Sequence, residues 1–265
     1  MNNDRIFDGI AEKFSSNIYG TTKGKLRHTL LCDVLEPYLT TPVRAIEIGG
    51  GTGVMTAHIA SKGHSVVLTD ASRDVLKQAE TLLADAPNIT IRHQYLQQIE
   101  DLDSFDLVIC HAVLEWLDAP FDAIDFMYKN MKPGSRLSLS FFNQDANLFA
   151  NAIYGNFDYI AKGMKVKKQV RLNPKQPLSA TRVVEHCESL GFKIIEKAGI
   201  RCFHDYMRDI THQSSINKHR REPWQQPYRG GNFGSEQLRP IPVQLACDRL
   251  PIAQKAPSLP RHHWG

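Results

Sequence analysis

The sequence lacks the features that mark membrane-spanning and secreted proteins. It contains no apolar run of about eighteen residues, which excludes a transmembrane helix of ordinary length. Its first residues, "MNNDRIFDGIAEKF", carry acids where a signal peptide would need an apolar core. We therefore expect a cytoplasmic protein with no membrane partner.

Cysteine is scarce, and its positions follow no pattern. There is no CxxC pair and no regular spacing, so the sequence predicts neither a disulfide framework nor a metal site, and we expect reduced thiols. The five residues are Cys32, Cys110, Cys187, Cys202 and Cys247.

An excess of one charge sign is absent from most of the chain. The formal net charge is +4, but residues 210–265 hold eight Lys or Arg against three acids, which leaves 24 basic and 25 acidic residues in 1–209. The same segment carries seven of the fourteen prolines, and most of it has neither helical nor strand periodicity. We expect an atypical, largely irregular tail over 210–265, and we infer no function from its charge.

From residue 43 the chain alternates short apolar runs with helical patterns. The strand-like runs are "VRAIEIG", "SVVLTD", "ITIRHQ", "FDLVICH" and "RLSLSFF", and the helical patterns cover 56–61, 72–84 and 123–131. This alternation is typical of an α/β fold with a mostly parallel, twisted sheet and helices on both faces. Further helices are expected over 24–38 and 181–190, with a strand within "FKIIEKAGIRCF". One domain fits the length of 265 residues.

A glycine-rich loop follows the first predicted strand. The stretch "AIEIGGGTGVMTAHIA" places Gly49, Gly51 and Gly53 before the next helix, where glycines let the backbone approach a ligand. The spacing is GxGxG, whereas a dinucleotide site has GxGxxG, and Glu47 precedes the loop. A carboxylate there would repel a pyrophosphate and suits a cationic or amine-bearing ligand.

Polar residues also follow the later predicted strands. Asp70 ends the second predicted strand. Taken alone, an acid at this position would be interpreted as a strand-end or helix-capping residue. The glycines upstream favour a functional role instead, in which its carboxylate accepts hydrogen bonds from both ribose hydroxyls of a nucleoside. Leu96 and Gln97 are candidates to meet a purine, with the start of a polar helix as the equal alternative. His111 ends the fourth strand and is a candidate contact to cofactor or substrate, the alternative being a structural histidine. Three nearby apolar residues are expected to pack: Leu114, Trp116 and Leu117.

Residues 162–175 gather six Lys or Arg in fourteen positions without an acid. The methyltransferase resemblance described below implies that the segment after the fifth strand lies over the active-site crevice, so these cations could neutralise phosphates while Phe157 and Tyr159 offer stacking faces to unpaired bases. The alternative is a solvated, charged face. The cations in question are Lys162, Lys165, Lys167, Lys168 and Arg171.

The acid, the GxGxG loop and the ribose-binding acid together resemble the class I S-adenosylmethionine-dependent methyltransferases, which have a Rossmann-like fold. Four longer stretches are similar to the bacterial tRNA 5-carboxymethoxyuridine methyltransferases, and the similarity covers residues 4 to about 209 in order. These stretches are "FDGIAEKFSSNIYGTTKGKLR", "FDLVICHAVLEWLDAP", "GNFDYIAKGMKVKKQVRLNP" and "GIRCFHDYMRD".

The resemblance implies methyl transfer from S-adenosylmethionine to the carboxylate of 5-carboxymethoxyuridine at the tRNA wobble position, giving 5-methoxycarbonylmethoxyuridine. The positions that match the family's cofactor contacts are Arg27 for the methionine carboxylate, Gly50 and Gly51 in the loop, Asp70 for the ribose, Leu96 or Gln97 for the adenine, and His111 at strand four.

No general base is expected, because a carboxylate nucleophile is already ionised at neutral pH and needs mainly to be held in line. Tyr19, Arg171 and Arg201 are candidates to position it. The alternatives are a packed tyrosine and solvated arginines.

The resemblance also suggests how the chain is organised. A methyltransferase domain over 1–209 would comprise an N-terminal helical part (1–42), a cofactor-binding core (43–143) and a basic substrate insert (144–178). The resemblance leaves a homodimer open as the assembly of the protein.

The similarity ends near Ile210. The family continues with a helix and a final antiparallel strand pair, whereas here only "IPVQLAC" could supply a strand, and Pro242 would place it at an edge. One hypothesis is a shift of reading frame near Ser215, in which case the sheet would lack a strand.

Two rival functions remain open from the sequence. One is a small-molecule carboxyl or O-methyltransferase, which would need an apolar lid in place of the lysines. The other is an S-adenosylmethionine-binding protein without catalysis.

Overall fold

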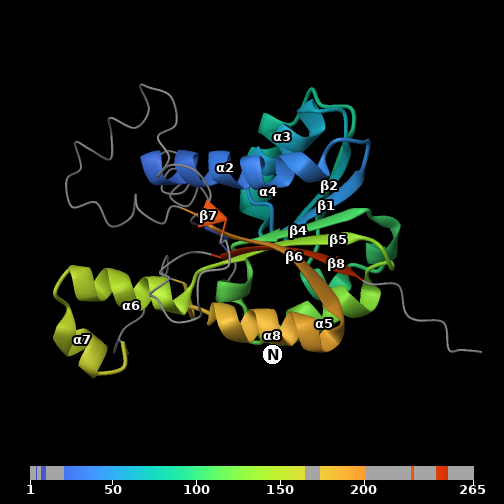
Figure 1. The fold of residues 1–265 in the computed structure, drawn as a ribbon. Helices are drawn as coiled ribbons and strands as arrows, with labels where there is room; N and C mark the ends of the chain where they lie inside the picture. The colour runs from blue at the N-terminus through green and yellow to red at the C-terminus, as the bar shows by residue number, and fades with distance from the viewer. Residues whose placement is uncertain are drawn as a thin grey trace, which may run out of the picture.

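The computed structural model describes residues 4, 7–9, 21–164 and 174–200, together with the backbone of 228–229 and 243–249. Within these residues the fold is a twisted sheet between two layers of helices (Figure 1). The predicted α/β fold class is therefore confirmed.

The described strands form one sheet in the order β3-β2-β1-β4-β5-β8-β6-β7. The first five in the chain pair in parallel, and each later strand pairs antiparallel with its neighbours. Their bounds are β1 Arg44–Ile48, β2 Ser65–Asp70, β3 Ile89–His93, β4 Leu107–His111, β5 Arg136–Phe141, β6 Phe192–Gly199, β7 Tyr228–Arg229 and β8 Val243–Arg249. The four strands β2, β1, β4 and β5 are buried almost throughout, because helices cover both of their faces.

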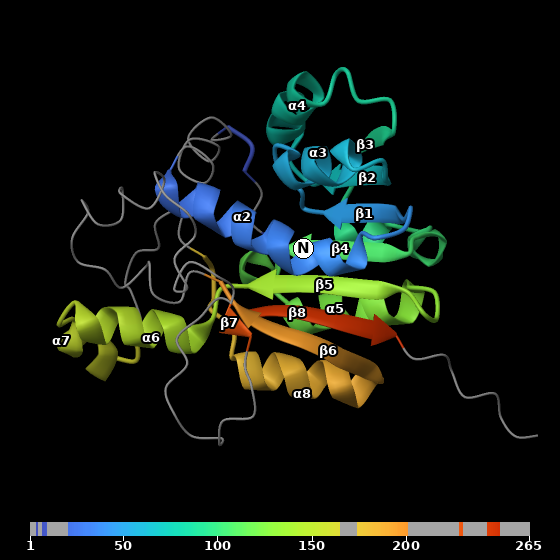
Figure 2. The ribbon, with the colours of Figure 1, turned by 45° about the horizontal axis from the view of Figure 1, so that its top comes forward.

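The helices divide between the two faces of the sheet, as Figures 1 and 2 show. On one face lie α2 (Thr22–Leu35), α3 (Val54–Ser61) and α4 (Arg73–Leu82), and on the other lie α5 (Pro120–Asn130) and α8 (Ala180–Leu190). Short 3-10 turns connect several elements: η1 Glu36–Tyr38, η2 Leu96–Gln98, η3 Leu102–Ser104 and η4 Leu114–Trp116.

Helix ends follow from local side-chain chemistry. The hydroxyls of Thr21, Ser72 and Ser179 each accept a backbone N–H in the first turn of α2, α4 and α8. Helix α8 ends at Gly191, whose φ of 104° suits glycine. The helix predicted over 24–38 divides into α2 and η1 at Pro37, which cannot donate the next helical hydrogen bond.

Side chains that alternate along the central strands build two cores. Ile46 and Ile48 of β1 face α5 and α8, while Ala45, the residue before Ile46, faces α2 and α3. Alternation is expected because successive strand residues point to opposite faces. The larger cluster, on the α5 and α8 side, also contains the fully buried Phe105 and Ile124.

The predicted edge position of the strand in "IPVQLAC" is wrong. Strand β8 lies inside the sheet, between β5 and β6, so the sheet does not lack this strand. Pro242 stands immediately before the first strand residue, Val243, and therefore removes no hydrogen bond from the ladder. Part of the 210–265 tail, predicted to be largely irregular, thus contributes to the sheet.

Strand order reverses between β1 and β4, where α/β sheets open a crevice at their carboxyl edge. Two helices of the insert, α6 (Gln144–Ile153) and α7 (Phe157–Ala161), project beyond this edge, on the side to which the arrowheads of β1 and β5 point (Figure 2). None of the described helices has the length and apolar character to cross a membrane.

Candidate functional site

A cavity of about 310 Å³ lies at the carboxyl ends of β1, β2, β4 and β5. Most of the predicted cofactor contacts line it: Arg27, Gly49, Gly51, Asp70, Leu96, Gln97 and His111. The structure thus brings together residues from α2, the glycine loop, two strand ends and η2.

The glycine loop turns where side chains would be strained. Gly49 and Gly51 have φ values of 63° and 59°, in the left-handed region that favours glycine. A Cβ at Gly49 would lie 2.5 Å from Cγ2 of Val113. Both glycines line the cavity, so the loop backbone forms part of its wall.

Three other predicted residues are not part of the cavity wall. Glu47 is buried under the loop, where its Oε2 accepts a hydrogen bond from Thr56 Oγ1. A Cβ at Gly50 would lie 2.9 Å from that same Oε2, and Gly53 caps the start of α3. Burial raises the pKa of Glu47 to about 7, with the hydrogen bond from Thr56 opposing the shift.

Asp70 connects the end of β2 to the glycine loop. Its Oδ2 accepts the N–H of Gly51 at 3.0 Å, and its Oδ1 accepts the N–H of Ser72 at 2.8 Å. Burial nevertheless raises the pKa of Asp70 above its usual value. Each oxygen of an ionised carboxylate has a further lone pair, so Asp70 can still accept hydrogen bonds from a ligand in the cavity.

His111 ends β4 at the cavity wall. One ring nitrogen, Nε2, lies 2.8 Å from Ser138 Oγ, and the other, Nδ1, is buried with no hydrogen-bond partner among the described residues. Burial lowers the pKa of His111 to about 3, helped by the positive charge of Arg27. The imidazole is therefore neutral at physiological pH and presents an unpaired polar atom.

Glu115, a buried acid at the cavity wall, is not among the residues predicted from the sequence. It lies in η4 between the apolar neighbours Leu114 and Trp116, and its Oε2 has no hydrogen-bond partner among the described residues. Burial raises the pKa of Glu115 to about 7, and the charge of Arg27 opposes the shift. Its backbone carbonyl accepts the N–H groups of Lys175 and Gln176.

The residues predicted to pack around η4 divide in two. Leu114 is fully buried, whereas Trp116 and Leu117 also line the cavity. The ring of Phe7 meets Trp116 edge to face, with centroids 5.0 Å apart, and Phe7 lines the cavity as well. Asp8 accepts a 2.7 Å hydrogen bond from Ser72 Oγ, so the described N-terminal residues lie against the same site.

The described part of the basic insert up to Met164 lies outside the cavity. Phe157 is 65% exposed, Lys162 is exposed and Tyr159 is half-buried, and none of the three lines the wall. Tyr154 lies in the same α6–α7 region and is 52% exposed. It is not among the residues predicted from the sequence. Pro174, where the described chain resumes, does line the cavity.

Several predicted residues lie outside the described part of the structure. These are Tyr19 and Arg201 among the positioning candidates, and Lys165, Lys167, Lys168 and Arg171 of the basic run.

Comparison with known proteins agrees with this geometry. Residues 46–137 match the family profile described as a methyltransferase domain. The chain is 39% identical over 220 residues to the tRNA 5-carboxymethoxyuridine methyltransferase of Escherichia coli O157:H7, an alignment that covers 79% of this chain and 84% of the relative.

Solved methyltransferases share the fold at low sequence identity. A SAM-dependent methyltransferase from Thermotoga maritima superposes with a TM-score of 0.61 at 13% identity, covering 92% of this chain and 97% of that one. Magnesium protoporphyrin IX methyltransferase from Synechocystis PCC 6803, with bound SAH, gives 0.58 at 16% identity, covering 92% and 95%. On the sequence match above and this shared fold, the chain belongs to the tRNA 5-carboxymethoxyuridine methyltransferase family.

Proposed function

We propose that this protein transfers a methyl group from S-adenosylmethionine to the carboxylate of 5-carboxymethoxyuridine at the wobble position of tRNA. The product is the methyl ester, 5-methoxycarbonylmethoxyuridine. The observation that carries the proposal is the cavity itself, where Arg27, the glycine loop and Asp70 meet in a chain of this family.

The cavity suits a nucleoside-based cofactor. Its volume of about 310 Å³ lies in the range of small-molecule sites. Gly49 and Gly51 contribute only backbone to the cavity wall, and the unpartnered His111 Nδ1 and Glu115 Oε2 offer polar atoms to a ligand. When bound, S-adenosylmethionine supplies an electrophilic methyl group on a sulfonium ion.

Arg27 would hold the cofactor's methionine carboxylate. It lies on α2, lines the cavity, and is close enough to affect the pKa of both His111 and Glu115. A guanidinium fork can donate two parallel hydrogen bonds to a carboxylate, which fixes the orientation of the bound group.

Asp70, Leu96 and Gln97 would hold the adenosine part. The carboxylate of Asp70 is fixed by two backbone donors and has capacity left for ribose hydroxyls. Leu96 is buried and offers an apolar surface to a purine, while Gln97 beside it is exposed and can reach a polar ring edge.

The substrate needs no general base from the protein. Its carboxylate is ionised at neutral pH, so the work of the site is to hold one oxygen in line with the methyl group and to exclude water. His111, with a pKa of about 3, adds no positive charge to the site at neutral pH. Trp116 and Phe7 give the cavity an aromatic wall next to Glu115.

The insert after β5 would contact the tRNA. The exposed Phe157 and Tyr154 offer ring faces to unpaired bases, and the basic run begins at the exposed Lys162. The run stands in the chain between α7 and Pro174, a residue of the cavity wall. Its lysines would neutralise backbone phosphates, while Tyr19, Arg171 and Arg201 stay candidates to position the carboxylate.

Mass spectrometry of tRNA nucleosides from cells with and without the gene tests the proposal. Deletion should remove the methyl ester and accumulate 5-carboxymethoxyuridine, and the wild-type gene should restore the ester while an Asp70→Ala variant should not. Wobble nucleosides that are unchanged on deletion would overturn the proposal and favour a small-molecule substrate or cofactor binding without catalysis.

A further inference from the structure

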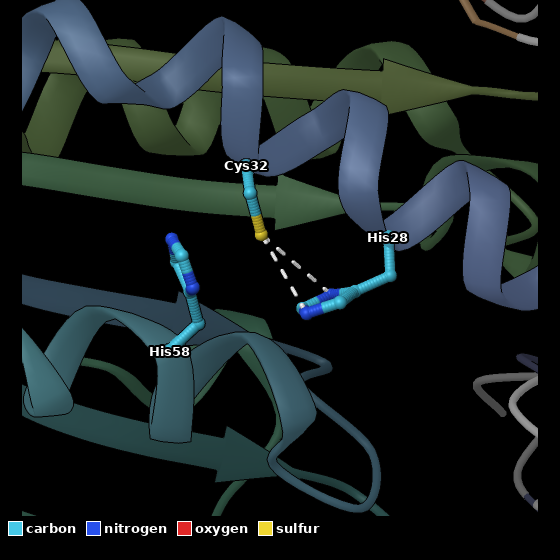
Figure 3. A group of neighbouring side chains, drawn as sticks. All are labelled: His28, Cys32 and His58. Carbon is cyan, nitrogen blue, oxygen red and sulfur yellow. Dashed lines mark hydrogen bonds between the residues drawn. The ribbon is translucent and has the colours of Figure 1, made fainter. Parts of the chain in front are cut away.

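Three side chains that commonly bind metals meet between α2 and α3. His28 and Cys32 are one helical turn apart and share a face of α2, and His58 approaches from α3. Figure 3 shows the thiol of Cys32 pointing between the two imidazole rings.

The distances are close to those of a coordinated metal. One ligand atom from each residue lies within 4.8 Å of the other two, and Cys32 Sγ lies 3.6 Å from His28 Nε2. Around a tetrahedral zinc ion, sulfur at about 2.3 Å and nitrogen at about 2.0 Å stand roughly 3.5 Å apart. The Cys32 and His28 atoms already have this separation, and the ligand atom of His58 lies within 4.8 Å of both.

One nitrogen of the cluster is buried without a hydrogen-bond partner among the described residues. This atom is Nε2 of His58. The thiol of Cys32 is part of a buried residue, and both histidines are half-buried.

A purely structural role accounts for part of this arrangement. The two rings stack edge to face with centroids 6.0 Å apart, and the 3.6 Å contact of Cys32 with His28 is compatible with a weak hydrogen bond. That role does not satisfy His58 Nε2. Nearby, the positive charge of Lys62 is offset by its 2.7 Å ion pair with Glu36.

We propose that His28, Cys32 and His58 form a zinc site that ties α2 to α3. Two imidazoles and a thiolate are ligands that Zn²⁺ binds well, and three protein ligands leave a fourth position for water. The Cys32 thiol proton passes to solvent when the metal binds. Because His28 follows Arg27 in α2, a metal here would also hold the helix that carries Arg27 to the cavity.

Titration of the full-length, metal-free protein with Co²⁺ tests the site, since cobalt reports its ligands by absorption. The wild type should bind one equivalent and develop a thiolate-to-cobalt charge-transfer band in the near ultraviolet, with strong visible bands typical of tetrahedral cobalt. Competition with Zn²⁺ should bleach these bands, and Zn²⁺ alone should raise the melting temperature.

Matched variants locate the metal. Cys32→Ala should abolish the charge-transfer band, and His28→Gln or His58→Gln should weaken cobalt binding by about tenfold or more. Cys187→Ala, which removes a buried thiol of α8 on the other face of the sheet, should leave the band unchanged.

Two results would overturn the proposal. One is a wild-type protein that folds, as judged by circular dichroism, but shows no charge-transfer band. The other is a band that persists in Cys32→Ala, which would place the metal on another thiol. The spectra are recorded without tRNA or S-adenosylmethionine, so they are independent of the proposed methyl transfer.

Discussion

At the residue scale, Asp70 connects the glycine loop to the wall of the cavity. Its two oxygens accept backbone N–H groups from Gly51 and Ser72, so the carboxylate is oriented before any ligand binds. A ligand hydroxyl can then form hydrogen bonds without first ordering the side chain, which lowers the entropy cost of binding.

Asp70→Asn tests this orientation. The amide nitrogen cannot accept a hydrogen bond, so one backbone N–H loses its partner and the ribose loses a charged acceptor, which together should weaken cofactor binding by about ten- to a hundredfold. Isothermal titration with S-adenosylhomocysteine measures the change. Asp103→Asn, at an exposed acid in η3, serves as the control, and equal affinities of Asp70→Asn and wild type would contradict the assignment.

Glu47 should make stability depend on pH. Its folded-state pKa of about 7 exceeds the ordinary 4.5, so the folded protein holds this proton where the unfolded chain releases it, and stability falls as pH rises from about 4.5 to about 7. Glu47→Gln can still accept the hydrogen bond of Thr56 and should be more stable than the wild type at pH 8, by up to about 3 kcal/mol.

That advantage should shrink as the pH approaches 5. Urea unfolding of both proteins across this range measures it, with Glu80→Gln at an exposed position of α4 as the control. A difference between Glu47→Gln and wild type that stays constant with pH would show that Glu47 does not titrate as described.

The role of a single residue could be predicted from the sequence where a local sequence pattern marks its position. Asp70 and the glycines stand at fixed distances from a strand end, and Arg27 was found by resemblance. The place of Glu115 at the cavity was not predicted, because this residue stands between apolar neighbours and its position at the wall depends on the fold. The cluster of His28, Cys32 and His58 was not predicted either. Its members come from two helices, and the spacing of cysteines in the sequence does not show how these helices pack.

At the element scale, the loop between β1 and α3 is packed tightly against its surroundings. A Cβ on Gly50 would come 2.1 Å from Leu68 Cδ1 and 2.8 Å from Glu47 Cδ, and both of those side chains are buried. The loop therefore has little space to shift toward Leu68 and Glu47, and its shape at the cavity depends on these two side chains.

Gly50→Ala should cost about 1–3 kcal/mol of stability and weaken cofactor binding, because the extra methyl group overpacks the loop. Gly63→Ala is the matched control. Its φ of 89° strains an alanine, whereas a Cβ there meets open space, so stability should fall without loss of cofactor binding. Thermal melts and titration with S-adenosylhomocysteine separate the two effects, and normal cofactor affinity in a folded Gly50→Ala protein would contradict this account.

Parallel strands and their helices were predictable from periodicity, whereas β8 was misplaced. The runs for β1, β2, β4 and β5 are short, apolar and followed by helical patterns, which is a local signal. The place of β8 between β5 and β6 depends on antiparallel pairing with residues far away in the chain, and the pattern within the strand does not encode it.

At the scale of the whole molecule, the exposed aromatic residues of the insert lie apart from the cavity. The cavity lies at the carboxyl edge of the sheet, and α6 and α7 project beyond that edge with Phe157 and Tyr154 exposed (Figure 2). We infer a division of labour in which the sheet holds the cofactor and the insert holds the nucleic acid.

Alanine at Lys165, Lys167 and Lys168 should weaken tRNA binding and leave cofactor affinity unchanged. Each phosphate contact releases counterions from the tRNA when it forms. The loss of three such contacts should therefore reduce the magnitude of the slope of log affinity against log salt concentration by roughly two to three. Fluorescence titrations with tRNA at several salt concentrations measure it. The same number of exposed lysines changed elsewhere, Lys129, Lys193 and Lys197, should have little effect, and equal losses in both variants would refute a specific contact.

Methyl transfer in a purified system tests the central claim most directly. The protein is incubated with S-adenosylmethionine and tRNA that carries 5-carboxymethoxyuridine, and the nucleosides are then analysed by mass spectrometry. The account predicts that this nucleoside gains the mass of one methylene group, as a methyl ester that mild alkali removes. A protein that binds the cofactor but leaves 5-carboxymethoxyuridine unchanged would contradict it.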